Sequence, residues 1–229
     1  MQRSTVAIIT VIALVASTTT AYAFTSDIQS QTLQVSAQRG ALFQVSTYNT
    51  LQAGDYNGET TLQDLRAHGD FGLGTFDALN GEMVLLNGTF YQIKSDGTVS
   101  VANDSMKTPF ADVTFFEPDS QLVLASRSPF PPEQLMPYPP LVDALKNQSI
   151  FGLHNVTGTF VGFFAPQYAS GICVAGWHFH FLTTDDEHGG HVLDVTLQNA
   201  TIQIDDLTAL SVALPTTSSF YALNLSNDT

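Results

Sequence analysis

Four of the chain's six histidines lie in the segment GWHFHFLTTDDEHGGHVLDVTL, residues 176–197. His178 and His180 are two residues apart in a run that predicts a β-strand, so both side chains leave the same face of the sheet. His191 begins a second strand-like run after a polar segment. If the runs pair antiparallel with His180 opposite His191, all three imidazoles share one face. Three neutral imidazoles with an open fourth position are the usual ligands of a catalytic zinc ion.

The alternative to a metal site is an ordinary hairpin whose polar face is solvated and binds nothing. Pairing His180 with His191 leaves ten residues between them, which is long for a hairpin unless a bulge or a bend at Gly189-Gly190 shortens it. Phe179 and Phe181 alternate with the histidines and are expected to face the other way, into a core. This alternation and the matching parity of His191 favour the metal site.

The histidine spacing does not name a reaction by itself. Cupins and α-type carbonic anhydrases also use two histidines two residues apart and a later third one. The chain has no second cupin motif, and Glu187 is spaced wrongly for the usual cupin glutamate. His188 lies among three acidic residues and is expected at the surface, not as a ligand.

The N-terminus predicts export. Residues 1–23 have a basic start at Arg3, an apolar run from Val6 to Ala16, and small residues at Ala21 and Ala23, which is the layout of a secretory signal peptide cleaved after Ala23. Seven of the ten asparagines are followed two residues later by Ser or Thr, which predicts N-glycosylation if the host is a eukaryote. They are Asn87, Asn103, Asn147, Asn155, Asn199, Asn224 and Asn227. The chain is therefore expected to be a secreted glycoprotein.

The composition limits the partners. A net charge of −14 with only seven basic residues argues against nucleic acid or an anionic membrane surface as partner. After the signal peptide, no segment is long and apolar enough to span a bilayer. An anionic substrate needs a local positive site, and a metal ion is the obvious source. Cys173 is the single cysteine, and its apolar neighbours predict a buried residue rather than a thiol nucleophile.

The elements that must position the histidines are mostly strands. Alternating β-branched and aromatic residues predict strands over 41–48, 81–93, 112–118, 158–166, 177–184, 191–198 and 200–207. Asn87-Gly88, inside the second run, predicts a tight hairpin turn. Short helices are predicted over 60–69, which has a Thr N-cap and a terminal Gly, and over 137–148, which enters through prolines. The fold class is therefore α+β with mostly β content.

The proline-rich segment 128–140 is the best candidate for a linker. It divides the chain after the signal peptide into an N-terminal half, 24–127, and a C-terminal half, 141–229, which carries the histidine hairpin.

Four stretches resemble, in order, the α-acetolactate decarboxylase family. They are residues 46–84, 107–118, 137–141 and 158–194, and together they span most of the chain after the signal peptide. The resemblance implies an α+β protein of two similar halves with mixed sheets, usually a homodimer. It also implies a zinc site at the three histidines that side-chain parity had selected: His178, His180 and His191.

The resemblance implies a carboxy-lyase of acetoin biosynthesis. The substrate, 2-acetolactate, is a β-keto acid whose hydroxyl and ketone oxygens can chelate Zn²⁺ while carbon dioxide leaves and acetoin forms. A related 2-hydroxy-3-keto acid is an alternative substrate. By position, Thr47 matches a substrate-pocket threonine of the family, and Arg127 matches its active-site arginine.

The chain departs from the family where a proton must be delivered. Asn57 stands where the resemblance places a catalytic glutamate, and Glu59, two residues on, is the expected replacement. The family's second functional glutamate lies in a C-terminal tail, whereas no glutamate follows Glu187 here. A helix and a strand of the family are also missing before Arg127. Two functions stay open: a zinc-dependent decarboxylase weakened by these losses, and a non-catalytic zinc-binding homologue that binds a small hydroxy-keto acid or is structural.

Overall fold

The computed structural model describes residues 40–117, 120–121, 128–130, 134–196 and 200–223. In these ranges strands predominate, helices are short and the sheets are mixed, which confirms the predicted α+β fold class. No described helix is long and apolar enough to cross a membrane. The predicted signal peptide and Arg127 lie outside the described residues.

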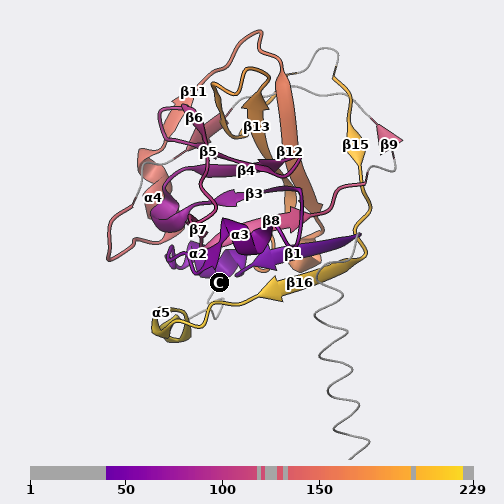
Figure 1. The fold of residues 1–229 in the computed structure, drawn as a ribbon. Helices are drawn as coiled ribbons and strands as arrows, with labels where there is room; N and C mark the ends of the chain where they lie inside the picture. The colour runs from indigo at the N-terminus through magenta and orange to yellow at the C-terminus, as the bar shows by residue number, and fades with distance from the viewer. Residues whose placement is uncertain (1–39, 118–119, 122–127, 131–133, 197–199, 224–229) are drawn as a thin grey trace, which may run out of the picture. The chain divides into compact units, whose positions relative to one another are not determined.

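A seven-stranded sheet forms the larger layer (Figure 1), in the order β16-β1-β8-β3-β4-β5-β6. Its strands are β1 (Ala41–Val45), β3 (Phe71–Thr75), β4 (Glu82–Leu86), β5 (Thr89–Ile93), β6 (Val99–Val101), β8 (Phe110–Thr114) and β16 (Ala209–Ala213). β1 and β16 are parallel, and the other neighbours are antiparallel. Because β16 comes late in the chain, the sheet combines strands from both of the predicted halves.

Two features of this sheet show what the sequence pattern could and could not predict. Asn87 and Gly88 join β4 to β5 with φ of 50° and 74°, the left-handed conformations of the predicted hairpin turn. β3, with the sequence FGLGT, was not predicted because its two glycines interrupt the apolar pattern. A Cβ at Gly72 or Gly74 would collide with backbone of the neighbouring β8, so close packing in mid-sheet requires glycine there.

A second sheet of three antiparallel strands, β12 (Gly158–Ala165), β13 (Gly176–Thr183) and β14 (Gly189–His191), carries the histidines. Figure 1 shows β12 and β13 crossing over β3 and β4. The two sheets enclose a buried apolar cluster of Leu73, Val84, Ile93, Val161 and Leu182. This core fixes the small sheet on the larger one.

The remaining elements are short. The two-stranded pairs are β2 (Thr60–Thr61) with β7 (Lys107–Thr108), β9 (Ser120–Gln121) with β15 (Gln203–Ile204), and β10 (Ser128–Phe130) with β11 (Ser149–Phe151). The helices are α2 (Tyr48–Gln52), α3 (Leu62–Leu65), α4 (Leu141–Ala144) and α5 (Ser218–Ala222), and the 3₁₀ turns are η1 (Asp77–Leu79), η2 (Leu145–Asn147) and η3 (Gln167–Ala169). α3 begins at a capping box between Thr61 and Asp64, inside the predicted helix 60–69.

Over the described residues 192–196, the predicted strand 191–198 is wrong. β14 ends at His191, and after one more backbone hydrogen bond, from Val192 N to Phe179 O (2.9 Å), the chain leaves the sheet. Leu193 is 57 % exposed. Alternation of apolar residues continues past His191, but alternation alone does not show whether a partner strand continues beside it.

Candidate metal centre

The pairing of β13 with β14 places His180 directly opposite His191, which confirms the predicted register. The ladder continues through Gly190 and Gly189, so the connecting loop is shorter than the sequence suggested. Thr183 closes this loop: its backbone N donates to His188 O (2.8 Å), and its Oγ1 accepts from His188 N (3.0 Å). A Cβ at Gly189 would collide with Phe181 O, so only glycine allows this close pairing.

The register brings the three predicted histidines together. One ring nitrogen from each of His178, His180 and His191 lies within 4.8 Å of the others. His178 and His180 are 8 % and 1 % exposed, because their face of β13 turns toward the seven-stranded sheet. His188 lies exposed in the loop, outside this group. The group could bind a metal ion.

The expectation that Phe179 and Phe181 face a core holds for Phe181, which is 2 % exposed, but not for Phe179, which is half-buried. The histidine face is buried as well, and the opposite face becomes exposed toward the start of the strand, at Trp177. Trp177 is 65 % exposed. Alternation determines which side chains share a face, but it does not determine which face another layer covers.

The three rings are neutral at neutral pH. Burial lowers the pKa of His178 to about 3 and the pKa of His191 to about 4, and it holds the pKa of His180 well below its usual value. The Nδ1 of His180 lies 2.8 Å from Met83 O, and a carbonyl only accepts, so Nδ1 carries the hydrogen. The Nε2 of His180 therefore presents a lone pair, which is the form that binds a metal.

Glu82, which the sequence interpretation did not single out, completes the centre. It is the first residue of β4 and is 4 % exposed. Its Oε2 lies 3.2 Å from Nε2 of His180, and its Oε1 lies 3.6 Å from Nδ1 of His191. Burial raises the pKa of this carboxyl well above its usual value. The sequence feature that could have pointed to Glu82 is its place, as an acidic residue, at the start of the predicted strand run 81–93.

These residues fit a bound cation. The lone pair on Nε2 of His180 and the carboxyl oxygen of Glu82 point at each other, and two acceptors repel unless a proton or a cation lies between them. Within the described residues, the Nδ1 of His178 is buried without a hydrogen-bond partner. Three neutral imidazoles and one carboxyl match the donor set of a divalent transition metal.

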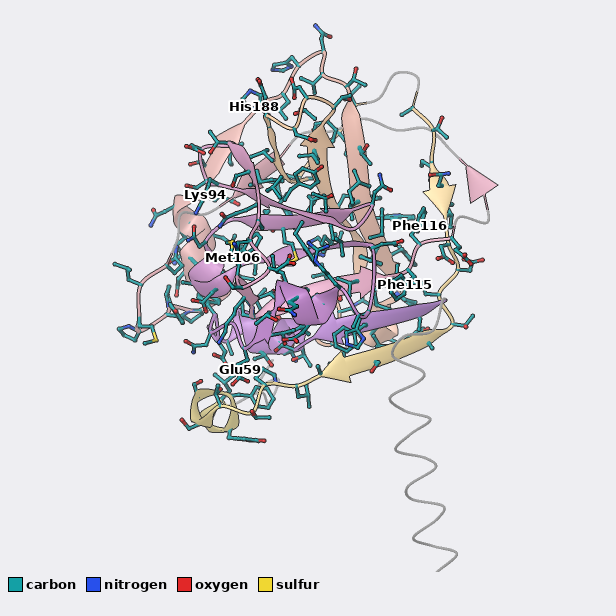
Figure 2. All side chains as sticks on the ribbon, in the orientation of Figure 1. Glu59, Lys94, Met106, Phe115, Phe116 and His188 are labelled. Carbon is teal, nitrogen blue, oxygen red and sulfur yellow. The ribbon has the colours of Figure 1, made fainter. Side chains whose placement is uncertain are left out.

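The other predicted site residues make different contacts. Thr47 is the N-cap of α2: its Oγ1 accepts from Thr50 N (3.2 Å) and lies 2.8 Å from Thr50 Oγ1. Glu59 is exposed and accepts from Thr216 N (2.8 Å). Figure 2 shows Glu59 beside α5, at the β16 edge of the large sheet, far from His188. The structure thus brings Glu82, and not Glu59, to the histidines.

The position that the resemblance assigned to a catalytic glutamate also has a local role. Asn57 donates from Nδ2 to Asp55 Oδ1 (3.0 Å). Asp55 is buried, at 6 % exposure. The carboxyl group at the centre comes instead from Glu82, so the change to Asn57 does not leave the site without an acid.

Comparison with known proteins identifies the family. The family model described as Alpha-acetolactate decarboxylase matches residues 42–131 and 126–227. Proteins named Alpha-acetolactate decarboxylase from Methanosarcina mazei and Methylococcus capsulatus are 38% and 39% identical to the chain, over 80% and 82% of it and 75% and 85% of their own lengths. The crystal structure of alpha-acetolactate decarboxylase from Bacillus subtilis strain 168 superposes with a TM-score of 0.78 at 34% identity, covering 82% of this chain and 94% of that one.

We expect the wild-type protein to bind one divalent ion per chain. His178→Ala, His180→Ala or His191→Ala should each abolish stoichiometric binding, because two remaining imidazoles hold an ion far more weakly. The measurement is metal content by elemental analysis after loading with cobalt(II) and desalting. His188→Ala is the matched control and should stay loaded. Well under one ion per wild-type chain would contradict the assignment.

Proposed function

Because the chain belongs to the α-acetolactate decarboxylase family, we propose that it is a zinc-dependent carboxy-lyase that converts 2-acetolactate to acetoin and carbon dioxide. The observation that carries the proposal is the buried group of three neutral histidines with the Glu82 carboxyl 3.2 Å from His180 Nε2. A related 2-hydroxy-3-keto acid is the nearest alternative substrate.

Zinc is the metal proposed because its catalytic sites combine three protein ligands with an open position. His178, His180 and His191 would hold it, and their lowered pKa values keep the lone pairs free at neutral pH. When bound, zinc supplies a Lewis acid that stabilises the negative charge on the substrate oxygens as carbon dioxide departs. Burial of the rings strengthens that electrostatic effect, because little water screens it.

The reaction needs one proton after the carbon–carbon bond breaks. The departing carbon dioxide leaves its bonding electron pair on the remaining fragment, and protonation at that carbon gives acetoin. Burial raises the pKa of Glu82 well above its usual value, which favours the protonated form that a proton donor needs. Its place beside the histidines supports it as the group that delivers the proton, and solvent then restores the carboxyl.

The alternative is a homologue that binds the metal without turnover. Its main support was the loss of a catalytic glutamate at Asn57, and Glu82 weakens that support because an acid is present at the centre. Arg127, which the resemblance matches to an active-site arginine, lies outside the described residues. An assay must therefore separate the two functions.

We also propose that the protein is exported through the signal peptide 1–23 and carries N-linked glycans in a eukaryotic host. The described acceptor asparagines support this, since Asn87, Asn103, Asn147 and Asn155 are all exposed. Asn199, Asn224 and Asn227 lie outside the described residues.

A homodimer is proposed on the outward face of the small sheet. Its side chains are the contacting rings of Phe160, Phe164, Trp177 and Phe179. None of these residues is ionisable, whereas the chain carries a net charge of −14. Two copies can meet there without bringing carboxylates together, and a two-fold axis makes one face complementary to itself. Large uncovered apolar surfaces mark interaction sites.

Glu82→Gln should lower the rate of acetoin formation by ~10²–10⁴-fold while bound zinc is retained, because the amide cannot supply the proton. The measurement is kcat for 2-acetolactate with zinc content determined in parallel. Glu187→Gln, in the exposed loop, is the control and should match wild type. If Glu59→Gln abolishes turnover and Glu82→Gln does not, the sequence-based assignment to Glu59 holds instead. A zinc-loaded wild type that makes no acetoin supports the non-catalytic alternative.

The export proposal predicts that material secreted by a eukaryotic host begins at Phe24. N-terminal sequencing locates the cleavage site, and a mobility shift on treatment with an N-glycosidase detects glycans. An intact Met1 on cytosolic protein would refute both parts.

Trp177→Ser should shift the protein from dimer to monomer, because it removes the most exposed ring of the proposed interface. Light scattering across a concentration series measures the mass. Tyr221→Ser, at a residue of α5 that is 72 % exposed, is the control and should stay dimeric. A wild type that is monomeric at the highest concentrations would overturn the proposed dimer.

A further inference from the structure

Gln44 is a completely buried amide whose polar atoms are all engaged. It lies in β1 and is 0 % exposed. Its Nε2 donates to Ser46 O (2.7 Å) and to Ile172 O (2.7 Å), and its Oε1 accepts from the Cys173 thiol (3.1 Å). The side chain therefore connects the large sheet to the segment that leads into β13.

That segment, Gly171 to Cys173, is held from a second side by the start of α2. Tyr48 N donates to Ile172 O (2.8 Å), and Asn49 N donates to Gly171 O (2.8 Å). Gly171 has a φ of +87°, and a Cβ there would meet Asn49 Nδ2 at 2.8 Å, so the fit is close. Ile172 O thus receives two donors, one of which belongs to Gln44.

Two residues separate the tethered segment from the strand with the metal ligands. β13 starts at Gly176, which has a φ of +88°, and His178 is its third residue. The ring of His180 has its own anchor, the carbonyl of Met83. In the described part of the chain, Nδ1 of His178 has no hydrogen-bond partner, so no second bond orients that ring. The ring of His178 is therefore placed by its backbone, which pairs with Phe163 of β12 on one side and is led into by the tethered segment on the other.

We infer that Gln44 is a positioning residue for the metal centre: by holding Gly171 to Cys173, it sets the start of β13 and with it the ring of His178. The inference rests on the proposed metal site. Groups outside the ligand set that orient ligands typically change metal affinity 10–100-fold when they are removed.

Leucine is the informative replacement at position 44. It has a similar volume and removes all three hydrogen bonds. Glutamate would instead place a second carboxyl next to Asp112, which pairs with Gln44 in the sheet and is itself buried. Cys173→Ala tests the hydrogen bond from the thiol by itself, because it removes the thiol and leaves both hydrogen bonds donated by the Gln44 amide in place.

The test compares Gln44→Leu with Thr114→Val, which removes another buried hydrogen bond of the same sheet, from Thr114 Oγ1 to Ala41 O (2.9 Å). Cobalt(II) affinity is measured by competition with a chelator, and the visible spectrum of the cobalt(II) form reports the coordination geometry. All measurements are made well below the melting temperature of each variant.

Gln44→Leu should bind cobalt(II) about 10–100-fold more weakly and show a changed spectrum. Thr114→Val should lose stability but keep the wild-type affinity and spectrum, and Cys173→Ala should stay within a few-fold of wild type. If Gln44→Leu does not fold, Gln44→Met, which keeps the chain length, is measured in its place.

Wild-type affinity and spectrum in the Gln44 variant would overturn this inference alone, leaving the residue a purely structural role. Equal weakening by Gln44→Leu and Thr114→Val would overturn it too, since the effect would then follow stability. A wild-type protein that binds no cobalt(II) would refute the metal site itself, and the positioning role with it.

Discussion

The structure depends on one electrostatic requirement, which is that a carboxyl and three imidazole rings share a buried space. Oε2 of Glu82 and Nε2 of His180 lie 3.2 Å apart, and both atoms are acceptors when the carboxyl is ionised and Nδ1 carries the hydrogen of the ring. The ion pairs described for Glu82 involve only His180 and His191, and neither a lysine nor an arginine is among them. A buried carboxylate without a cation is unfavourable by several kcal/mol, so a proton or a metal ion must complete the group.

The two sheets supply the groups of this centre from opposite sides. The large sheet supplies Glu82 and the carbonyl of Met83 from adjacent positions of β4. The small sheet supplies the three rings, and its apolar residues Val161 and Leu182 pack on the large sheet beside them. A bound ion would therefore link two layers that hydrophobic packing already holds together. This division explains why ligands from one hairpin and an acid far away in sequence form one centre.

The sequence predicted those parts of the centre that a local rule controls. A side-chain period of two and the requirement for equal parity identified His178, His180 and His191, and Asn87-Gly88 predicted its turn from backbone conformation alone. Glu82 was missed because its proximity to His180 follows from the stacking of two sheets, which no local pattern records. The burial of the histidine face of β13 was missed for the same reason. Asn57 was singled out by the resemblance, and Glu59 was chosen only because it lies two residues away in sequence, which does not report distance across a sheet.

The histidines and the glutamate respond to pH in opposite directions, and this explains what a metal ion does for the fold. Burial lowers the pKa of His178 to about 3, below its unfolded value of roughly 6.5, so this ring disfavours folding as pH falls below about 6.5. Burial raises the pKa of Glu82 above its unfolded value of roughly 4.3, so this carboxyl disfavours folding as pH rises above that value. At neutral pH the rings are neutral in both the folded and the unfolded chain, so of these four groups Glu82 alone opposes folding. A divalent ion would bind the lone pairs of the neutral rings in the folded state, and this binding would add stability that the empty centre lacks.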